Sequence, residues 1–144
     1  MWPNPGRLPN PNCAPAGTAV FSARMKYPDN VVSIHPYMRA KPGQIGELRA
    51  LFPKFVERTA KEPLCLFYEF TVNGDVTFCR EAYIGAEGVQ AHLANVGDLI
   101  DVQLKYGDLF RLELHGPAAE LDKLRPGLAK MNVEWFIKEA GVRK

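Results

Sequence analysis

A tight hairpin in the middle of the chain restricts the possible folds more than any other feature of the sequence. Asn73-Gly74-Asp75 separates two runs that are rich in apolar and aromatic residues, 64–72 and 76–83. Asn-Gly pairs favour two-residue turns whose twist matches that of paired antiparallel strands. The sequence therefore predicts two neighbouring antiparallel strands.

Hydrophobic periodicity predicts further strands and helices on both sides of this hairpin. Strands are expected at 31–39, 64–72, 76–83, 109–115 and 133–137, and helices at 44–60, at 86–94, in a further piece capped by Asp98, and at 121–131 with an interruption at Pro126-Gly127. Pro53 should kink the first helix because its nitrogen cannot donate a backbone hydrogen bond. Pro36 suggests an edge or a bulge in the first strand.

The order of these elements is β-α-β-β-α-β with an appended α-β. This is the ferredoxin-like order of an α+β fold, with helices on one face of an antiparallel sheet. In the strand 64–72, Tyr68 and Phe70 point to one face whereas Cys65 and Phe67 point to the other. Large exposed apolar faces are rare in monomers, so we expect a second copy to cover the other face as a homodimeric α+β barrel.

Proline and charge divide the chain into two parts. Residues 1–30 hold six of the twelve prolines and three basic side chains against one acidic side chain. This composition predicts an extended or disordered proline-rich arm at 1–30 and a folded domain at 31–144. The domain has 15 basic and 15 acidic residues, so its net charge is zero and gives no indication of a nucleic-acid partner. No stretch approaches the ~18 apolar residues of a membrane span, so no membrane partner is expected.

Cysteines and histidines are few and widely spaced. The three cysteines form no C-x-x-C pair: Cys13, Cys65 and Cys79. Neither a disulfide framework nor a zinc pattern follows, and a reduced, cytoplasmic protein is the default expectation. The three histidines lie far apart in the sequence, at positions 35, 92 and 115, so no metal site is predicted.

Two stretches around the hairpin resemble the antibiotic biosynthesis monooxygenase (ABM) domain family. Residues 62–70, Glu-Pro-Leu-Cys-Leu-Phe-Tyr-Glu-Phe, resemble its second strand. Residues 78–83 and 86–93 resemble its strand-then-helix signature, a Glu on the strand and Ala-His-Leu on the helix. The resemblance covers about residues 31–115 and implies a dimeric α+β barrel. The sequence departs from the usual Gly, Trp and Ala of the family at Leu64, Tyr83 and Gly88.

The resemblance also implies a range of functions. The family includes cofactor-independent oxygenases of quinols and aromatic polyketides, haem-degrading enzymes and proteins without a known reaction. Its haem-degrading branch carries a histidine in the next helix, and residues 99–106 contain none. We expect a monooxygenase that acts without a cofactor on a small aromatic or quinol substrate. The alternatives are a non-catalytic dimeric module that binds a small ligand or acts in stress response, and a structural dimer whose interior is filled by side chains.

Three residues are candidate catalytic groups. The His92 imidazole can exchange a proton near neutral pH. Glu81, at the end of the adjoining strand, can accept a hydrogen bond from this ring, although such a pair can also be purely structural. The Tyr68 phenol can stabilise developing negative charge, or be a buried tyrosine with a satisfied hydroxyl. Candidate substrate-binding residues are Tyr83, His35, Tyr37 and Phe70.

Overall fold

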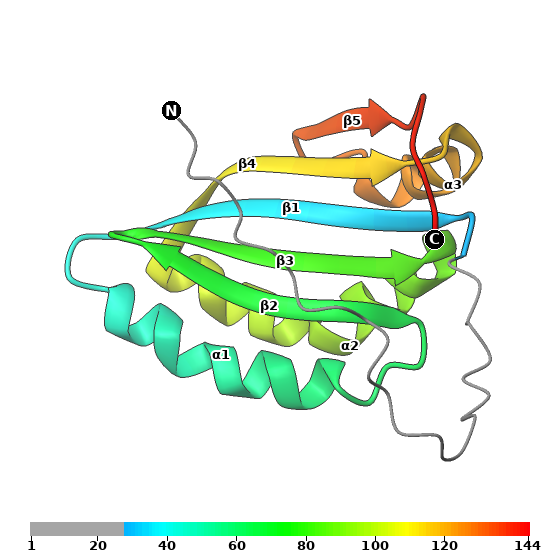
Figure 1. The fold of residues 1–144 in the computed structure, drawn as a ribbon. Coiled ribbons are helices and arrows are strands. Elements are labelled where there is room, and N and C mark those ends of the chain that lie inside the picture. The colour runs from blue at the N-terminus through cyan, green and yellow to red at the C-terminus, as the bar shows by residue number, and fades with distance from the viewer. Residues whose placement is uncertain (1–27) are drawn as a thin grey trace, which may run out of the picture.

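The structure, a computed structural model, describes residues 28–144. Most of the predicted arm at 1–30 therefore lies outside the described residues. The elements are β1 (Val31–Ala40), α1 (Ile45–Thr59), β2 (Cys65–Asn73), β3 (Val76–Ile84), α2 (Gly85–Tyr106), β4 (Gly107–Gly116), α3 (Ala118–Leu124), the 3-10 helix η1 (Pro126–Leu128) and β5 (Val133–Ile137) (Figure 1). This order confirms the predicted succession of strands and helices.

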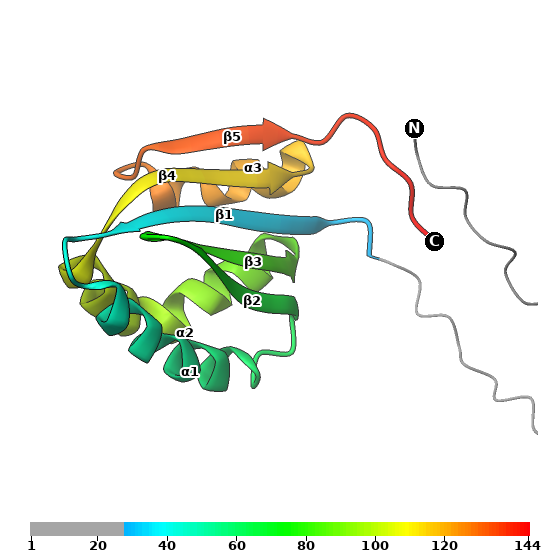
Figure 2. The ribbon, with the colours of Figure 1, turned by 60° about the vertical axis from the view of Figure 1, so that its left-hand side comes forward.

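One sheet of five strands, in the order β2-β3-β1-β4-β5, forms the centre of the fold. Strands β1 to β4 pair antiparallel, and β5 adds to β4 in parallel after α3 crosses over. Helices α1 and α2 lie against one face of the sheet (Figures 1 and 2). Leu121 and Leu124 of α3 join the core on this same face. The α+β ferredoxin-like fold is therefore confirmed, with a mixed sheet because β5 is parallel.

The central hairpin has the predicted turn. Gly74 has a φ of 61°, in the left-handed region that a tight hairpin turn demands and that glycine adopts without strain. Asn73 then pairs with Val76 across the turn, and the pairing continues to Cys65 opposite Tyr83. A register irregularity between Cys65 and Phe67 turns Cys65 toward the helix side, where it packs against the core. The expectation that these two residues share a face is therefore wrong.

Helix α2 is a single helix of 22 residues, whereas the sequence predicted two shorter pieces. Asp98 does not cap a second helix, because its carboxylate instead pairs with the Arg58 guanidinium at the end of α1. Gly97, one residue earlier, lies within the helix with open space beside its Cα. Contacts between α1 and α2 therefore continue through the point where the local sequence suggested a break.

A register shift between β1 and β4 changes the position of one aromatic residue. The alternation of 109–115 placed Phe110 on the same face as Leu112 and Leu114. The pairing shifts between Tyr37 and Met38, next to the Pro36 that suggested an edge or a bulge. Phe110 consequently lies beside Tyr37, with ring centroids 6.1 Å apart, on the other face of the sheet.

The sheet face that points away from the helices, called the open face below, is rich in aromatic side chains. Three of its phenylalanines are partly exposed: Phe67 at 40%, Phe110 at 51% and Phe136 at 41%. No helix or strand within residues 28–144 covers this face (Figure 2). None of the helices in the same range is long and apolar enough to span a bilayer.

Two glycines of α2 allow a matched test of how tightly this helix packs. A Cβ on Gly88 would lie 2.9 Å from the Tyr83 Cβ and 3.2 Å from the Leu64 Cβ, whereas one on Gly97 would meet nothing within 4 Å. Gly88, Tyr83 and Leu64 are also the three positions at which the sequence departs from the usual residues of the ABM family. Gly97→Ala should raise the free energy of unfolding by about 0.5–1 kcal/mol.

Gly88→Ala brings the same gain in helix propensity but adds an overpacking cost of about 1–3 kcal/mol. Urea unfolding should therefore show Gly88→Ala to be the less stable of the two variants. Equal stability of both variants would contradict the tight contact between α2 and β3.

Candidate active site

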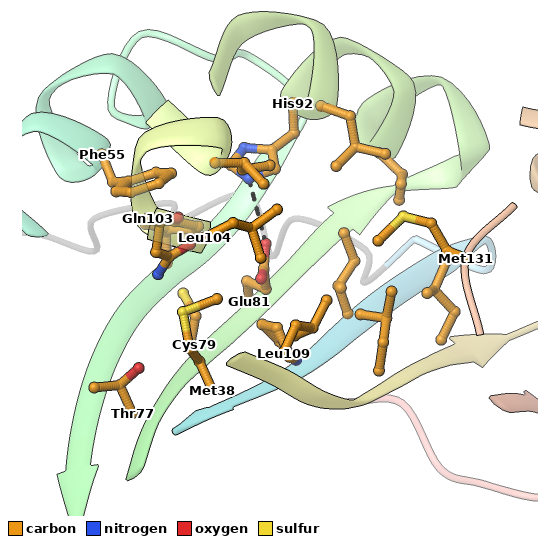
Figure 3. A pocket seen from close by; sticks show the side chains of 18 of the residues that line it. Met38, Phe55, Thr77, Cys79, Glu81, His92, Gln103, Leu104, Leu109 and Met131 are labelled. Atoms are coloured by element: carbon orange, nitrogen blue, oxygen red, sulfur yellow. Dashed lines mark ion pairs between the residues drawn. The ribbon is translucent and has the colours of Figure 1, made fainter. Parts of the chain in front are cut away.

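A cavity of about 150 Å³ lies between the sheet and helix α2 (Figure 3). Its lining is mostly apolar and includes Ile34, Met38, Phe55, Phe70, Leu112 and Met131. Glu81 and His92 reach it from opposite sides, one from β3 and the other from α2. An apolar cavity with a few converging polar groups is the usual form of a small-molecule site.

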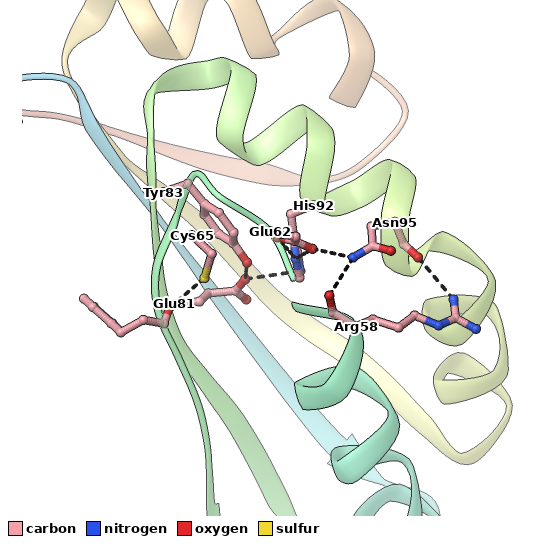
Figure 4. A network of polar contacts seen from close by, with 8 residues as sticks. Arg58, Glu62, Cys65, Glu81, Tyr83, His92 and Asn95 are labelled. Carbon is pink, nitrogen blue, oxygen red and sulfur yellow. Dashed lines mark hydrogen bonds and ion pairs between the residues drawn. The ribbon is translucent and has the colours of Figure 1, made fainter. Parts of the chain in front are cut away.

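The His92 ring is held between two carboxyl groups (Figure 4). Its Nδ1 lies 3.0 and 3.1 Å from the two carboxylate oxygens of Glu62, and its Nε2 lies 3.5 Å from Oε2 of Glu81. The ring belongs to the buried side of α2, together with Val89 and Val96. Because an ionised carboxylate only accepts hydrogen bonds, Nδ1 of the neutral ring carries the proton and donates to Glu62. The lone pair of Nε2 then faces Glu81.

Glu62 was not among the predicted site residues. It lies in the segment between α1 and β2, and its side chain is only 8% exposed. Asn95 donates to Glu62 Oε1 over 2.8 Å and to the Arg58 carbonyl over 3.2 Å, so the carboxylate is oriented from the end of α1 (Figure 4). The one signal in the sequence was its position at the start of the stretch that resembles the ABM family.

Glu81 is an acid that stays protonated near neutral pH. Burial is the main cause that raises the pKa of Glu81 to about 8; the hydrogen bond from Tyr83 opposes this rise, and the nearby Glu62 adds a smaller one. Burial also lowers the pKa of His92, more than Glu62 raises it. At pH 7 the cavity therefore faces a neutral carboxylic acid and a neutral imidazole side by side.

The predicted site residues fall into three groups. Tyr68 and Phe70 line the cavity with Glu81 and His92, and the Tyr68 ring centroid lies 5.2 Å from that of His92. Burial raises the pKa of Tyr68, so its phenol keeps its proton.

Tyr83 is fully buried and does not line the cavity. Its hydroxyl donates to Glu81 Oε2, so it positions the acid and does not contact a ligand there. His35 and Tyr37 lie on the open face and do not line this cavity either. Strand β1 has a period of two, so its cavity-lining residues are Ile34, Pro36 and Met38.

Comparisons with known proteins agree with this fold. MupZ from Pseudomonas fluorescens is 36% identical, and the alignment covers 79% of this chain and 94% of that protein with a TM-score of 0.76. A candidate antibiotic biosynthesis monooxygenase from Chloroflexus aurantiacus is 24% identical over 61% of this chain and 93% of that chain, with a TM-score of 0.50. A further solved antibiotic biosynthesis monooxygenase is 20% identical over 58% and 92%, with a TM-score of 0.51. No family model matches the sequence, and no curated protein matches it.

The raised pKa of Glu81 predicts a pH-dependent stability. The folded chain keeps a proton on Glu81 up to about pH 8, whereas the unfolded chain releases it near pH 4.5. This contribution to stability is present below pH 4.5 and is lost as the pH rises to about 8. The lowered pKa of His92 acts in the opposite direction, and its effect ends near pH 6.5.

Between these two limits, pH 6.5 and about 8, the free energy of unfolding should fall by about 1–2 kcal/mol. Glu81→Gln should flatten this decline in urea titrations at several pH values, because the amide does not ionise. Glu87→Gln, at an exposed position of α2, should keep the slope of the wild type. The same slope in wild type and Glu81→Gln would show that Glu81 does not titrate in this range.

Proposed function

Because this chain belongs to the antibiotic biosynthesis monooxygenase domain family, we propose that it is a monooxygenase acting without a cofactor on a small, electron-rich phenol or quinol. The observation that carries the proposal is the uncharged pair of Glu81 and His92 on the wall of an apolar cavity. One group can accept a proton and the other can donate one at the same pH. Such a pair suits a substrate that is first deprotonated and later reprotonated.

The size of the cavity favours a substrate with one aromatic ring. An apolar cavity of about 150 Å³ is large enough to hold benzene, and the cavity here has that volume. Its presence argues against the alternative of an interior filled by side chains. The aromatic lining residues Phe55 and Phe70 provide flat apolar surfaces for a ring.

The first step is removal of the phenolic proton. His92 Nε2 takes the proton, and the imidazolium that forms is stabilised by Glu62 on Nδ1. The Tyr68 hydroxyl and the protonated Glu81 supply hydrogen bonds to the phenolate. The apolar surroundings strengthen these interactions because little water competes with them.

The second step joins the substrate to molecular oxygen. The electron pair of the phenolate forms a bond from a ring carbon to O₂, and Glu81 protonates the distal oxygen to give a hydroperoxide. The Glu81 carboxylate then removes the hydrogen of that ring carbon, the O–O bond breaks, and a carbonyl forms. The departing hydroxide takes the proton from His92 and leaves as water. The substrate loses four electrons, O₂ gains four, and both side chains regain their starting protonation.

A homodimer is the second part of the proposal. The partly exposed Phe67, Phe110 and Phe136 on the open face support pairing of two copies through that face, as the resemblance to the family implies. The cytoplasmic location expected from the cysteines stays a prediction.

Oxygen consumption with a panel of monocyclic quinols and phenols tests the reaction. His92→Ala should lower kcat at least about 100-fold, because general-base catalysis typically contributes that much. Glu62→Gln should lower kcat less, because the ring stays but loses its charged partner. Activity should decline above about pH 8, where Glu81 loses its proton.

Gln90→Ala, at an exposed position of the same helix, is the matched control and should keep the wild-type rate. If quinols bind without oxygen uptake, the protein is the non-catalytic binding module of the alternative interpretation. Oxygen uptake that is unchanged in His92→Ala would refute the role of the base.

Sedimentation analysis tests the dimer. Phe110→Glu should shift the wild-type dimer toward monomer, because it places a charge on the apolar surface of the proposed interface. Val56→Glu is the control, since Val56 is 44% exposed on α1, away from the open face. A wild-type chain that sediments as a monomer would remove this part of the proposal and leave the reaction in the cavity untouched.

A further inference from the structure

A second cluster of chemically active side chains lies on the open face, away from the cavity. It consists of His35 on β1 and of Glu113 and His115 on β4. The antiparallel register places His35 directly opposite Glu113, and the period of two puts His115 on the same face. The sequence predicted no metal site because these residues lie far apart along the chain. The strand pairing brings them together.

We propose that His35, Glu113 and His115 bind a divalent first-row transition-metal ion, with Zn²⁺ as the ion that best fits this ligand set. Two imidazoles and one carboxylate form a ligand set found in zinc enzymes, and it leaves one of four positions for water. Imidazole suits zinc and its neighbours in the series, whereas magnesium and calcium prefer oxygen ligands alone.

The geometry is close to that of a bound ion. One ligand atom from each side chain lies within 4.8 Å of the other two. Ligand bonds of 2.0–2.1 Å require about 3.3 Å between ligand atoms in a tetrahedral site. The ligand atoms therefore need to approach one another by up to about 1.5 Å, which rotation of the imidazole rings can supply.

The hydrogen-bond partners of the two histidine rings are consistent with a bound cation. Nε2 of His115 is buried and has no hydrogen-bond partner among the described residues, and it lies 3.5 Å from Glu113 Oε2. Ser33 Oγ lies 2.8 Å from Nε2 of His35 and orients that ring.

The surrounding groups also hold the cluster in place. Arg111 lies 2.8 Å from Glu113 Oε1 and 3.3 Å from Glu134 Oε2, so two carboxylates share one guanidinium. The ring of Phe136 stacks on His115, with centroids 4.4 Å apart. The cluster and the cavity lie on opposite faces of the sheet, so metal binding does not depend on the proposed oxygenase reaction. The cluster does lie on the face through which two copies are proposed to pair.

Isothermal titration of the full chain with Zn²⁺, after removal of bound metal by a chelator, tests the proposal. We expect one ion per chain with a Kd of about 1 μM or tighter. His115→Ala and Glu113→Gln should each weaken binding at least about tenfold. Glu134→Gln is the matched control: it removes the other carboxylate partner of Arg111 but none of the three ligands, and should bind like the wild type.

A Co²⁺ spectrum identifies the ligand atoms, and circular dichroism checks that the variants fold. Co²⁺ bound to the wild type should show a visible spectrum of nitrogen and oxygen ligands without the charge-transfer band of a thiolate, and Cys65→Ser should not change it. If circular dichroism shows that His115→Ala does not fold, the isosteric Glu113→Gln decides. Absence of binding up to about 1 mM Zn²⁺ would overturn the proposal. Equal weakening by Glu134→Gln, or a thiolate spectrum, would also overturn it.

Discussion

The buried imidazole of His92 connects three separate parts of the chain. Glu62, which follows α1, holds one ring nitrogen, and Glu81 of β3 lies at the other, while the ring itself belongs to α2. Two ionised carboxylates this close together in an apolar interior would repel each other strongly. The structure meets this constraint by keeping Glu81 protonated beside a neutral ring. The contacts that join the helix layer to the sheet therefore also create the acid and the base of the candidate active site.

The alternation of side chains along each strand gives the two faces of the sheet different chemistry. On β3, Cys79 and Glu81 point to the helices and the cavity, whereas Phe78 packs with His35 and Tyr37 on the open face. The candidate active site and an aromatic, histidine-bearing surface are thus separated by the thickness of one sheet. A ligand bound on one face contacts none of the side chains that act on the other.

Much of the fold could be predicted because its signals are local. The turn at Asn73-Gly74 and the periodicity of each segment are properties of a few consecutive residues, and they were sufficient for the order of strands and helices. The errors arose where distant contacts override local preference. Helix α2 continues through Gly97, where Asp98 is bound by Arg58 instead of capping a new helix. Phe110 changes face because the pairing of β1 with β4 shifts.

The sequence by itself determined that His92 and Glu81 share a strand-then-helix unit, since they are only eleven residues apart and the intervening turn is short. Only the tertiary structure decided that Glu62 would hold His92, and that His35 would meet Glu113 and His115. Both groupings join residues 30 or more positions apart, so they depend on how helices dock and how strands pair. The physical reason is that packing of the whole core sets strand register and helix docking, and no local pattern encodes them.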